Sequence, residues 1–259
     1  MAVVPRHGKT SDVLIDEMEM TRFLQTATVS ASMDAPEKTT FGKNDREFIA
    51  GLRQATVACD GIFSATTGSS MAADNVADYL DAALGGSTKL VVTVGIDGGA
   101  STGNRAYLLT GDAIKLDYSA PFDDIVKIAA DIQASGGYQA GRWLVGPTTS
   151  TATANGGAVA AAGTTAAGGS TGGGVGHLHV LAERNVVSAV FKAQHSTSGS
   201  TWADLITFTS ATGRTFQRST VSGTIKERVR GALTTLTEGA TGGSITWAMA
   251  LARNGSPKK

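Results

Sequence analysis

The strongest constraint on the fold is the recurrence of short segments in which apolar and polar side chains alternate with a period of two. In residues 22–33, Phe23, Ala27, Val29 and Ala31 fall on one parity, and threonines and serines fall mostly on the other. Successive side chains of a β-strand point to opposite faces, so this pattern predicts a strand with one buried face. The chain is therefore expected to be mainly β.

Comparable patterns predict further strands at residues 51–63, 89–96 and 105–118. Residues 71–84 differ, because their apolar side chains recur at helical spacing and two glycines follow them. We therefore expect one short α-helix that packs on a sheet.

Residues 119–136 fit two patterns. Ser119, Pro121 and the acidic Asp123 and Asp124 form a typical helix start, and isoleucines follow at helical spacing. The same residues also alternate between apolar and polar side chains from Val126 onward. The local pattern favours a helix and leaves a strand open.

A long tract without charge divides the chain. Between Arg142 and Glu183 no side chain is charged, and residues 145–176 are almost entirely Gly, Ala, Thr and Ser. Such a composition buries little apolar surface and is typical of a linker, although it could also lie against a neighbouring subunit. Residues 177–253 then contain six strand-length segments separated by turn residues, which predicts a β-sandwich.

Charge is distributed unequally although the chain is neutral overall. Residues 1–150 contain 18 acidic and 12 basic side chains, and residues 151–259 contain 4 and 10, giving formal net charges of −6 and +6. Two domains often differ in this way by chance. The more specific interpretation is an acidic surface in the N-terminal half, which would repel nucleic-acid phosphates.

Residues 39–64, TTFGKNDREFIAGLRQATVACDGIFS, carry a family resemblance. A Phe-Gly pair, a mixture of acidic and basic residues, Ile-x-Gly-Leu-Arg and a strand ending in Asp-Gly-Ile-Phe resemble a segment of the major tail tube proteins of long-tailed bacteriophages. The resemblance implies two packed antiparallel sheets with one short α-helix, here followed by a C-terminal β-sandwich domain. It also implies hexameric rings that stack into a tail tube, with the inner sheets forming one β-barrel.

In that family the lumen passes the viral DNA and encloses the tape measure protein, and the tube ends on tail-tip and tail-terminator proteins. The implied location is the virion tail, assembled in the host cytoplasm and without a membrane partner. The resemblance also favours a strand at residues 121–135.

The resemblance and the composition together divide the chain into five parts. We expect an N-terminal arm at 1–20 that orders only on assembly, a tail tube domain at 21–146, a linker at 147–176, a β-sandwich domain at 177–253 and a tail at 254–259. The loop at 34–47 would reach a neighbouring subunit or ring. Its charged residues are the candidates for these contacts: Glu37, Lys38, Lys43, Asp45, Arg46 and Glu47.

The second half has a resemblance of its own. The run from Gln194 to Trp202 and the later Arg228-Val229-Arg230 resemble discoidin-like and carbohydrate-module sandwiches. Trp202 and Trp247 are therefore candidates for stacking on a sugar ring. Both also lie in apolar β segments, which favours a place in the core.

No pattern predicts an enzyme, a cofactor or a metal site. His177 and His179 would share one strand face as surface residues without a third ligand, and Cys59 is expected in the core. The acidic groups Asp16, Glu17, Glu19 and Asp123, Asp124 are expected to be solvated. No apolar stretch reaches the length of a membrane helix. The alternatives to a tail tube subunit are a capsid decoration protein and a carbohydrate-binding or adhesin module.

Overall fold

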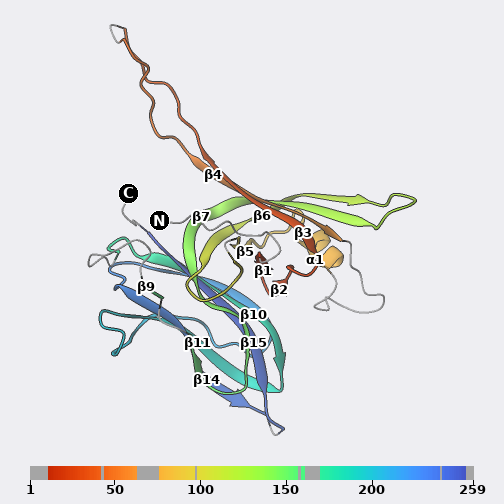
Figure 1. The fold of residues 1–259 in the computed structure, drawn as a ribbon, viewed down its shortest axis with the longest axis vertical. Helices are drawn as coiled ribbons and strands as arrows, with labels where there is room; N and C mark the ends of the chain where they lie inside the picture. The colour runs from red at the N-terminus through yellow and green to blue at the C-terminus, as the bar shows by residue number, and fades with distance from the viewer. Residues whose placement is uncertain are drawn as a thin grey trace.

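A computed structural model describes residues 11–41, 44–62, 76–96, 98–156, 159–160, 170–239 and 241–254. Within these ranges the chain is almost entirely β-structure with a single helix (Figure 1). The elements are β1 (Asp12–Ile15), β2 (Met18–Glu19), β3 (Leu24–Met33), β4 (Arg53–Ile62), α1 (Val76–Ala83), β5 (Leu90–Gly95), β6 (Arg105–Ser119), β7 (Lys127–Ser150), β8 (Ala154–Asn155), β9 (Val159–Ala160), β10 (Gly174–Arg184), β11 (Val186–Ser196), β12 (Ala203–Thr207), β13 (Thr215–Val221), β14 (Arg228–Glu238) and β15 (Ser244–Arg253).

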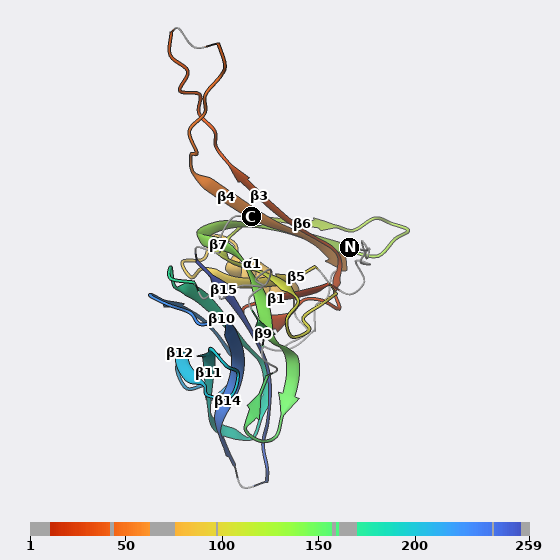
Figure 2. The same cartoon turned by 60° about the vertical axis from the view of Figure 1, so that its left-hand side comes forward.

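The strands form two antiparallel sheets, so the prediction of a mainly-β fold with two such sheets and one helix is confirmed. The larger sheet has the order β13-β10-β15-β7-β6-β5-β1-β2, and β4 joins it through β7 and carries β3. The smaller sheet has the order β12-β11-β14-β8, with β9 beside β14. Figure 2 shows the smaller sheet packed against the C-terminal strands of the larger one.

The long strand β7 connects the two halves of the chain. Its first part pairs with β4 and β6, and its last part, from Arg142 to Ser150, pairs with β15. Trp143 and Leu144 lie in this last part and are completely buried. The expected domain boundary at residue 146 therefore falls inside a strand whose neighbours come from both halves.

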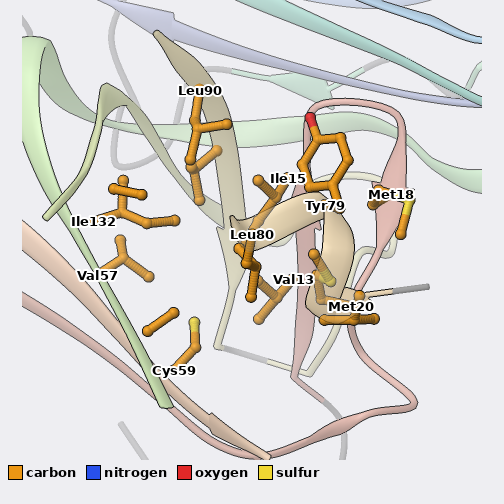
Figure 3. Packing of buried hydrophobic residues seen from close by; sticks show 14 of the residues in the cluster. Val13, Ile15, Met18, Met20, Val57, Cys59, Tyr79, Leu80, Leu90 and Ile132 are labelled. Atoms are coloured by element: carbon orange, nitrogen blue, oxygen red, sulfur yellow. The ribbon is translucent and has the colours of Figure 1, made fainter. Parts of the chain in front are cut away.

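One hydrophobic core lies between α1 and the N-terminal strands (Figure 3). The helix buries Val76, Tyr79 and Leu80 against side chains of β1, β4 and β5. The expected helix is confirmed from Val76 to Ala83, and its first five residues lie outside the described part of the chain. Cys59 is buried in this core, as the sequence predicted.

A second core lies between the smaller sheet and the C-terminal strands of the larger sheet. Phe191 and Trp247 meet at its centre, with 5.0 Å between their ring centroids. The indole N–H of Trp247 donates a hydrogen bond to Ser150 at 3.1 Å. Trp247 is 1% exposed, which confirms its place in the core and leaves no ring face for a sugar.

The expectation that residues 1–20 order only on assembly is wrong for Asp12–Met20. Strand β1 pairs with β5, and Leu14 and Ile15 are buried in two different clusters on its two faces. Short strands of mixed residues have weak periodicity. The acidic residues at 12, 16, 17 and 19 made the segment look polar, although apolar residues lie between them. Residues 1–10 lie outside the described part of the chain.

The segment with two possible structures is a strand from Lys127 onward, as the resemblance implied, and residues 121–126 form the turn before it. In this position the segment pairs with β4 on one side and β6 on the other. Two flanking ladders of hydrogen bonds outweigh the helical preference of the local sequence.

Buried polar groups connect the two halves of the chain, because side chains of β10 bond to β5 and to the residue after β1. His177 and His179 are buried and lie on one strand face, so the expectation of surface histidines is wrong. The Nδ1–H of His179 donates to the carbonyl of Asp16 at 2.6 Å, and the hydroxyl of Thr93 therefore donates to its Nε2 at 2.8 Å. The Thr93 hydroxyl also lies 3.1 Å from Nδ1 of His177.

Burial changes the acidity of these groups. It lowers the pKa of His179 to about 4, and it lowers the pKa of His177 well below its ordinary value. Burial also raises the pKa of Asp16 to about 6, although hydrogen bonds from Tyr79 and the N–H of Val91 oppose this increase. Protonation of the histidines and protonation of Asp16 therefore affect folding with opposite sign.

We predict that His179 makes the fold sensitive to acid. Its pKa is lower in the folded than in the unfolded protein, so its contribution is complete above about pH 6.5 and is lost as the pH falls toward 4. This loss amounts to about 3 kcal/mol of unfolding free energy. Urea unfolding at pH 7 and pH 4 should show a smaller acid-induced loss for His179→Gln than for the wild type. Equal losses would contradict the assignment.

Candidate assembly surface

Four strand segments form a strip in the larger sheet, on the branch that β4 and β3 add beside β7. Strands β3 and β4 lie next to each other, the first part of β7 follows, and the last part of β6 completes the strip. One face packs on the core through side chains such as Val57, Ile128 and Ile132. The opposite face has no helix or strand over it in either view (Figures 1 and 2).

This uncovered face is polar, and we call it the polar face. Residues that are directly opposite in neighbouring strands share a face, so the register defines its members. Side-chain hydrogen bonds connect adjacent strands, from Thr26 to Asp60 at 2.8 Å and from Thr56 to Gln133 at 2.9 Å. The polar face consists of Thr26, Thr28, Ser30, Ser32, Gln54, Thr56, Ala58, Asp60, Ile62, Asp112, Lys115, Asp117, Ser119, Lys127, Ala129, Asp131 and Gln133.

The polar face is acidic and lacks aromatic side chains. It carries four carboxylates and two ammonium groups, those of Lys115 and Lys127, which give a formal net charge of −2. The ammonium group of Lys115 lies 2.6 Å from Asp117, and this hydrogen bond raises the pKa of Lys115. The surface is therefore smooth, hydrophilic and repulsive to anions.

Both long edges of the strip lack a strand partner among the described residues. Strand β3 pairs with β4 alone, and residues Lys115–Ser119 of β6 pair with β7 alone. Unpaired N–H and C=O groups along such edges are able to pair with another strand. The two edges therefore offer complementary places for a second copy of the chain.

A long projection connects β3 and β4, and we call residues 34–52 the arm. Backbone hydrogen bonds hold its two sides together, including Asp34 N–H to Leu52 O at 3.0 Å and Lys38 N–H to Glu47 O at 2.8 Å. Figures 1 and 2 show it extending far from both sheets. The arm therefore has few intramolecular contacts beyond its own two sides.

The structure places five of the six predicted contact residues on the arm, and Lys43 lies outside the described residues. It brings together Lys38 and Glu47, whose charged atoms are 3.5 Å apart. Sequence reasoning overlooked the apolar side chains between the charges. Phe41, Phe48, Ile49 and Leu52 are exposed, and four large apolar residues in and beside a charged loop were the signal that could have revealed this surface.

A second projection is the turn that joins β6 to β7, and we call residues 114–127 the β6–β7 hairpin. Phe122 and Ile125 are exposed near its tip. The ammonium group of Lys127 donates a hydrogen bond to the Asp124 carboxylate at 2.7 Å, and this lowers the pKa of Asp124. The two predicted acidic residues here, Asp123 and Asp124, thus belong to a projecting turn.

The other predicted acidic group, Asp16, Glu17 and Glu19, does not bring its carboxylates together. Asp16 turns inward to Tyr79, whereas Glu19 lines an open pocket of about 420 Å³ beside Asp12. Burial raises the pKa of Glu19, and the neighbouring Asp12 adds to this effect. Among the described residues, no group of three or more potential ligands is arranged to hold a metal ion.

Trp202 lies half-buried on the outer side of the smaller sheet, so it is not part of the central core. The guanidinium of Arg230 covers its ring at 4.4 Å from the centroid. Arg230 also donates to Gln194, and Gln194 donates to Asp204, both at 2.9 Å. These contacts fix the indole, and its possible role in sugar binding remains a prediction.

Comparison with known proteins finds relatives only at the level of structure. No family model and no curated protein sequence matches the chain. A chain from the virion of a gene transfer agent particle is 13% identical, with a TM-score of 0.40, over 52% of this chain and 97% of its own. The SPP1 tail tube protein is 12% identical, with a TM-score of 0.39, over 52% and 78%.

The Dit protein of SPP1, described as a hub of the adsorption apparatus, is 10% identical with a TM-score of 0.36. This likeness covers 92% of the present chain and 98% of Dit. The structural neighbours are thus tail tube and hub proteins. Likenesses this distant do not determine function, so the proposal below rests on the geometry of this chain and on the sequence resemblance.

No helix in the described part of the chain has the length and apolar character to span a bilayer.

We predict that the arm is the first site of proteolysis in the unassembled protein. Trypsin cleaves after lysine and arginine, and Lys38 and Arg46 are exposed on the arm, away from both cores. Exposed projections also unfold locally more readily than sheets do. Brief trypsin treatment followed by mass spectrometry should show first cuts within residues 38–46 and an intact body. First cuts within β7 or β11 would contradict this description.

Proposed function

We propose that the chain is the repeating subunit of a phage tail tube. The observation that carries the proposal is the four-stranded strip, which has two unpartnered edges, one face on the core and one acidic polar face. Pairing of β3 in one copy with the last part of β6 in the next would remove both edges. Repetition of the same contact closes a ring, for which the family resemblance implies six copies.

The orientation of the strip in such a ring follows from its two faces. The core side of the strip is already covered by α1 and the N-terminal strands. The polar face would therefore line the lumen, where hydroxyls and carboxylates remain hydrated. Its net charge would keep DNA phosphates from adhering to the wall during passage.

The remaining parts of the chain have places in this arrangement. The smaller sheet lies on the side of the molecule away from the strip, so it would lie outside the lumen (Figure 2). The arm, at one end of the strip, would reach an adjacent subunit or ring. Stacked rings would form the tube in the virion, with DNA and the tape measure protein inside and tail-tip and tail-terminator proteins at its ends.

A structural role also fits the lack of converging catalytic groups in the described ranges. The two buried histidines bond to Thr93 and to a backbone carbonyl, and His195 accepts a hydrogen bond from the N–H of Lys226. We propose that the protein is not an enzyme and requires no cofactor.

Negative-stain electron microscopy of the full chain over a range of concentrations tests the function. We predict rings and stacked rings with a central lumen for the wild type. A variant in which a short Gly-Ser turn replaces residues 37–48 should keep its melting temperature, because the arm has no core contacts, and should form no tubes. A matched control, Val187→Ser on the exposed side of β11, should assemble like the wild type.

Other assembly states would contradict the proposal. A protein that stays trimeric at every concentration would favour a capsid decoration role, and a persistent monomer would favour an adhesin. Tubes formed by the variant with the shortened arm would remove the arm from the mechanism.

A further inference from the structure

Large exposed apolar side chains gather on two projections of the molecule. Ten of the thirteen such residues in the described ranges lie on the arm, at its base or on the β6–β7 hairpin. Single exposed apolar residues are common, but clusters of them mark interaction sites. The arm group is Met33, Phe41, Phe48, Ile49 and Leu52, and the hairpin group is Ile114, Tyr118, Phe122, Ile125 and Val126.

The two groups lie at opposite ends of the same strip. Met33 pairs with Arg53 where the arm begins, whereas Ile62 pairs with Lys127 beside the β6–β7 hairpin. Strand β4 spans the distance between these pairs with ten residues, or about 30 Å of extended chain. Figures 1 and 2 show the two projections leaving the strip at its two ends.

This separation prevents the two groups from covering each other within one molecule. Two different patches on opposite ends of a subunit are suited to a head-to-tail contact, in which each copy uses one patch for each neighbour. An arm-to-arm contact would instead be self-complementary, would leave the hairpin group exposed and would end after two copies.

Edge pairing within a ring adds a geometric argument. Copies related by rotation about one axis place every arm on one rim of the ring and every β6–β7 hairpin on the other. Stacking two such rings in the same direction then brings arms to hairpins and removes both apolar groups from water.

We propose that the apolar arm group of one copy docks on the β6–β7 hairpin of a second copy in the adjacent ring. This inference rests on the proposed function and specifies which surface receives the arm. It assigns a direct role to Phe122 and Ile125, which no sequence pattern singled out. It also gives the stack a direction, because the two ends of every ring are chemically different.

Disulfide cross-linking between variants that each carry one introduced cysteine tests the contact. One set carries Phe41→Cys or Phe48→Cys on the arm, and the other carries Phe122→Cys or Ile125→Cys on the hairpin. The native Cys59 does not interfere, because it is buried and burial raises its pKa to about 12. Val187→Cys mixed with each arm variant controls for random collisions.

We expect covalent dimers under mild oxidation only when an arm variant is mixed with a hairpin variant, at several times the yield of the Val187→Cys control. Dimers from an arm variant alone would overturn the head-to-tail contact and indicate arm-to-arm docking. The same samples are inspected by electron microscopy. Tubes without cross-links at any of the four position pairs would overturn this inference alone, whereas no rings or tubes from the wild type, examined beside the variants, would overturn the proposed function as well.

Discussion

The pairing of β7 on both of its sides is the interaction on which the rest of the structure depends. This strand of 24 residues bonds to β4 and β6 near its start and to β15 near its end. Gly141 lies against the backbone of β15, and a side chain there would collide with the carbonyl of Leu251. Because both halves of the chain attach to one strand, the strip and the C-terminal sandwich have a fixed relative position.

The strip that β7 supports has two chemically different faces. Its inner residues contribute to the core around Val57 and Ile132. Most of its outer residues carry hydroxyl, amide or carboxylate groups, which would stay hydrated both in a monomer and in the proposed lumen. In the proposed assembly, edge pairing and contacts between the projections would require no rearrangement of the core.

The sequence was sufficient to predict an element where one of its faces is polar and the other is apolar. The alternation in β3 and the helical spacing in α1 predicted both elements, because burial on one side leaves a periodic pattern. The sequence was insufficient where contacts with distant parts of the chain determine the structure or the burial of a residue. Strand β1 is too short for a clear period, and His179 is buried because Thr93 and the carbonyl of Asp16 satisfy its two nitrogens from elsewhere in the sequence. No periodic pattern predicts that Phe122 is exposed, because its exposure depends on how the hairpin folds.

The central claim is that the strip closes into a ring with its polar face inward. Cryo-electron microscopy of the assembled particles, at a resolution that separates strands, tests this claim most directly. The account predicts that β3 of one copy pairs with the last part of β6 of the next and that Asp60 and Asp131 face the lumen. Rings joined through β12 or β13, or a polar face that points outward, would contradict it.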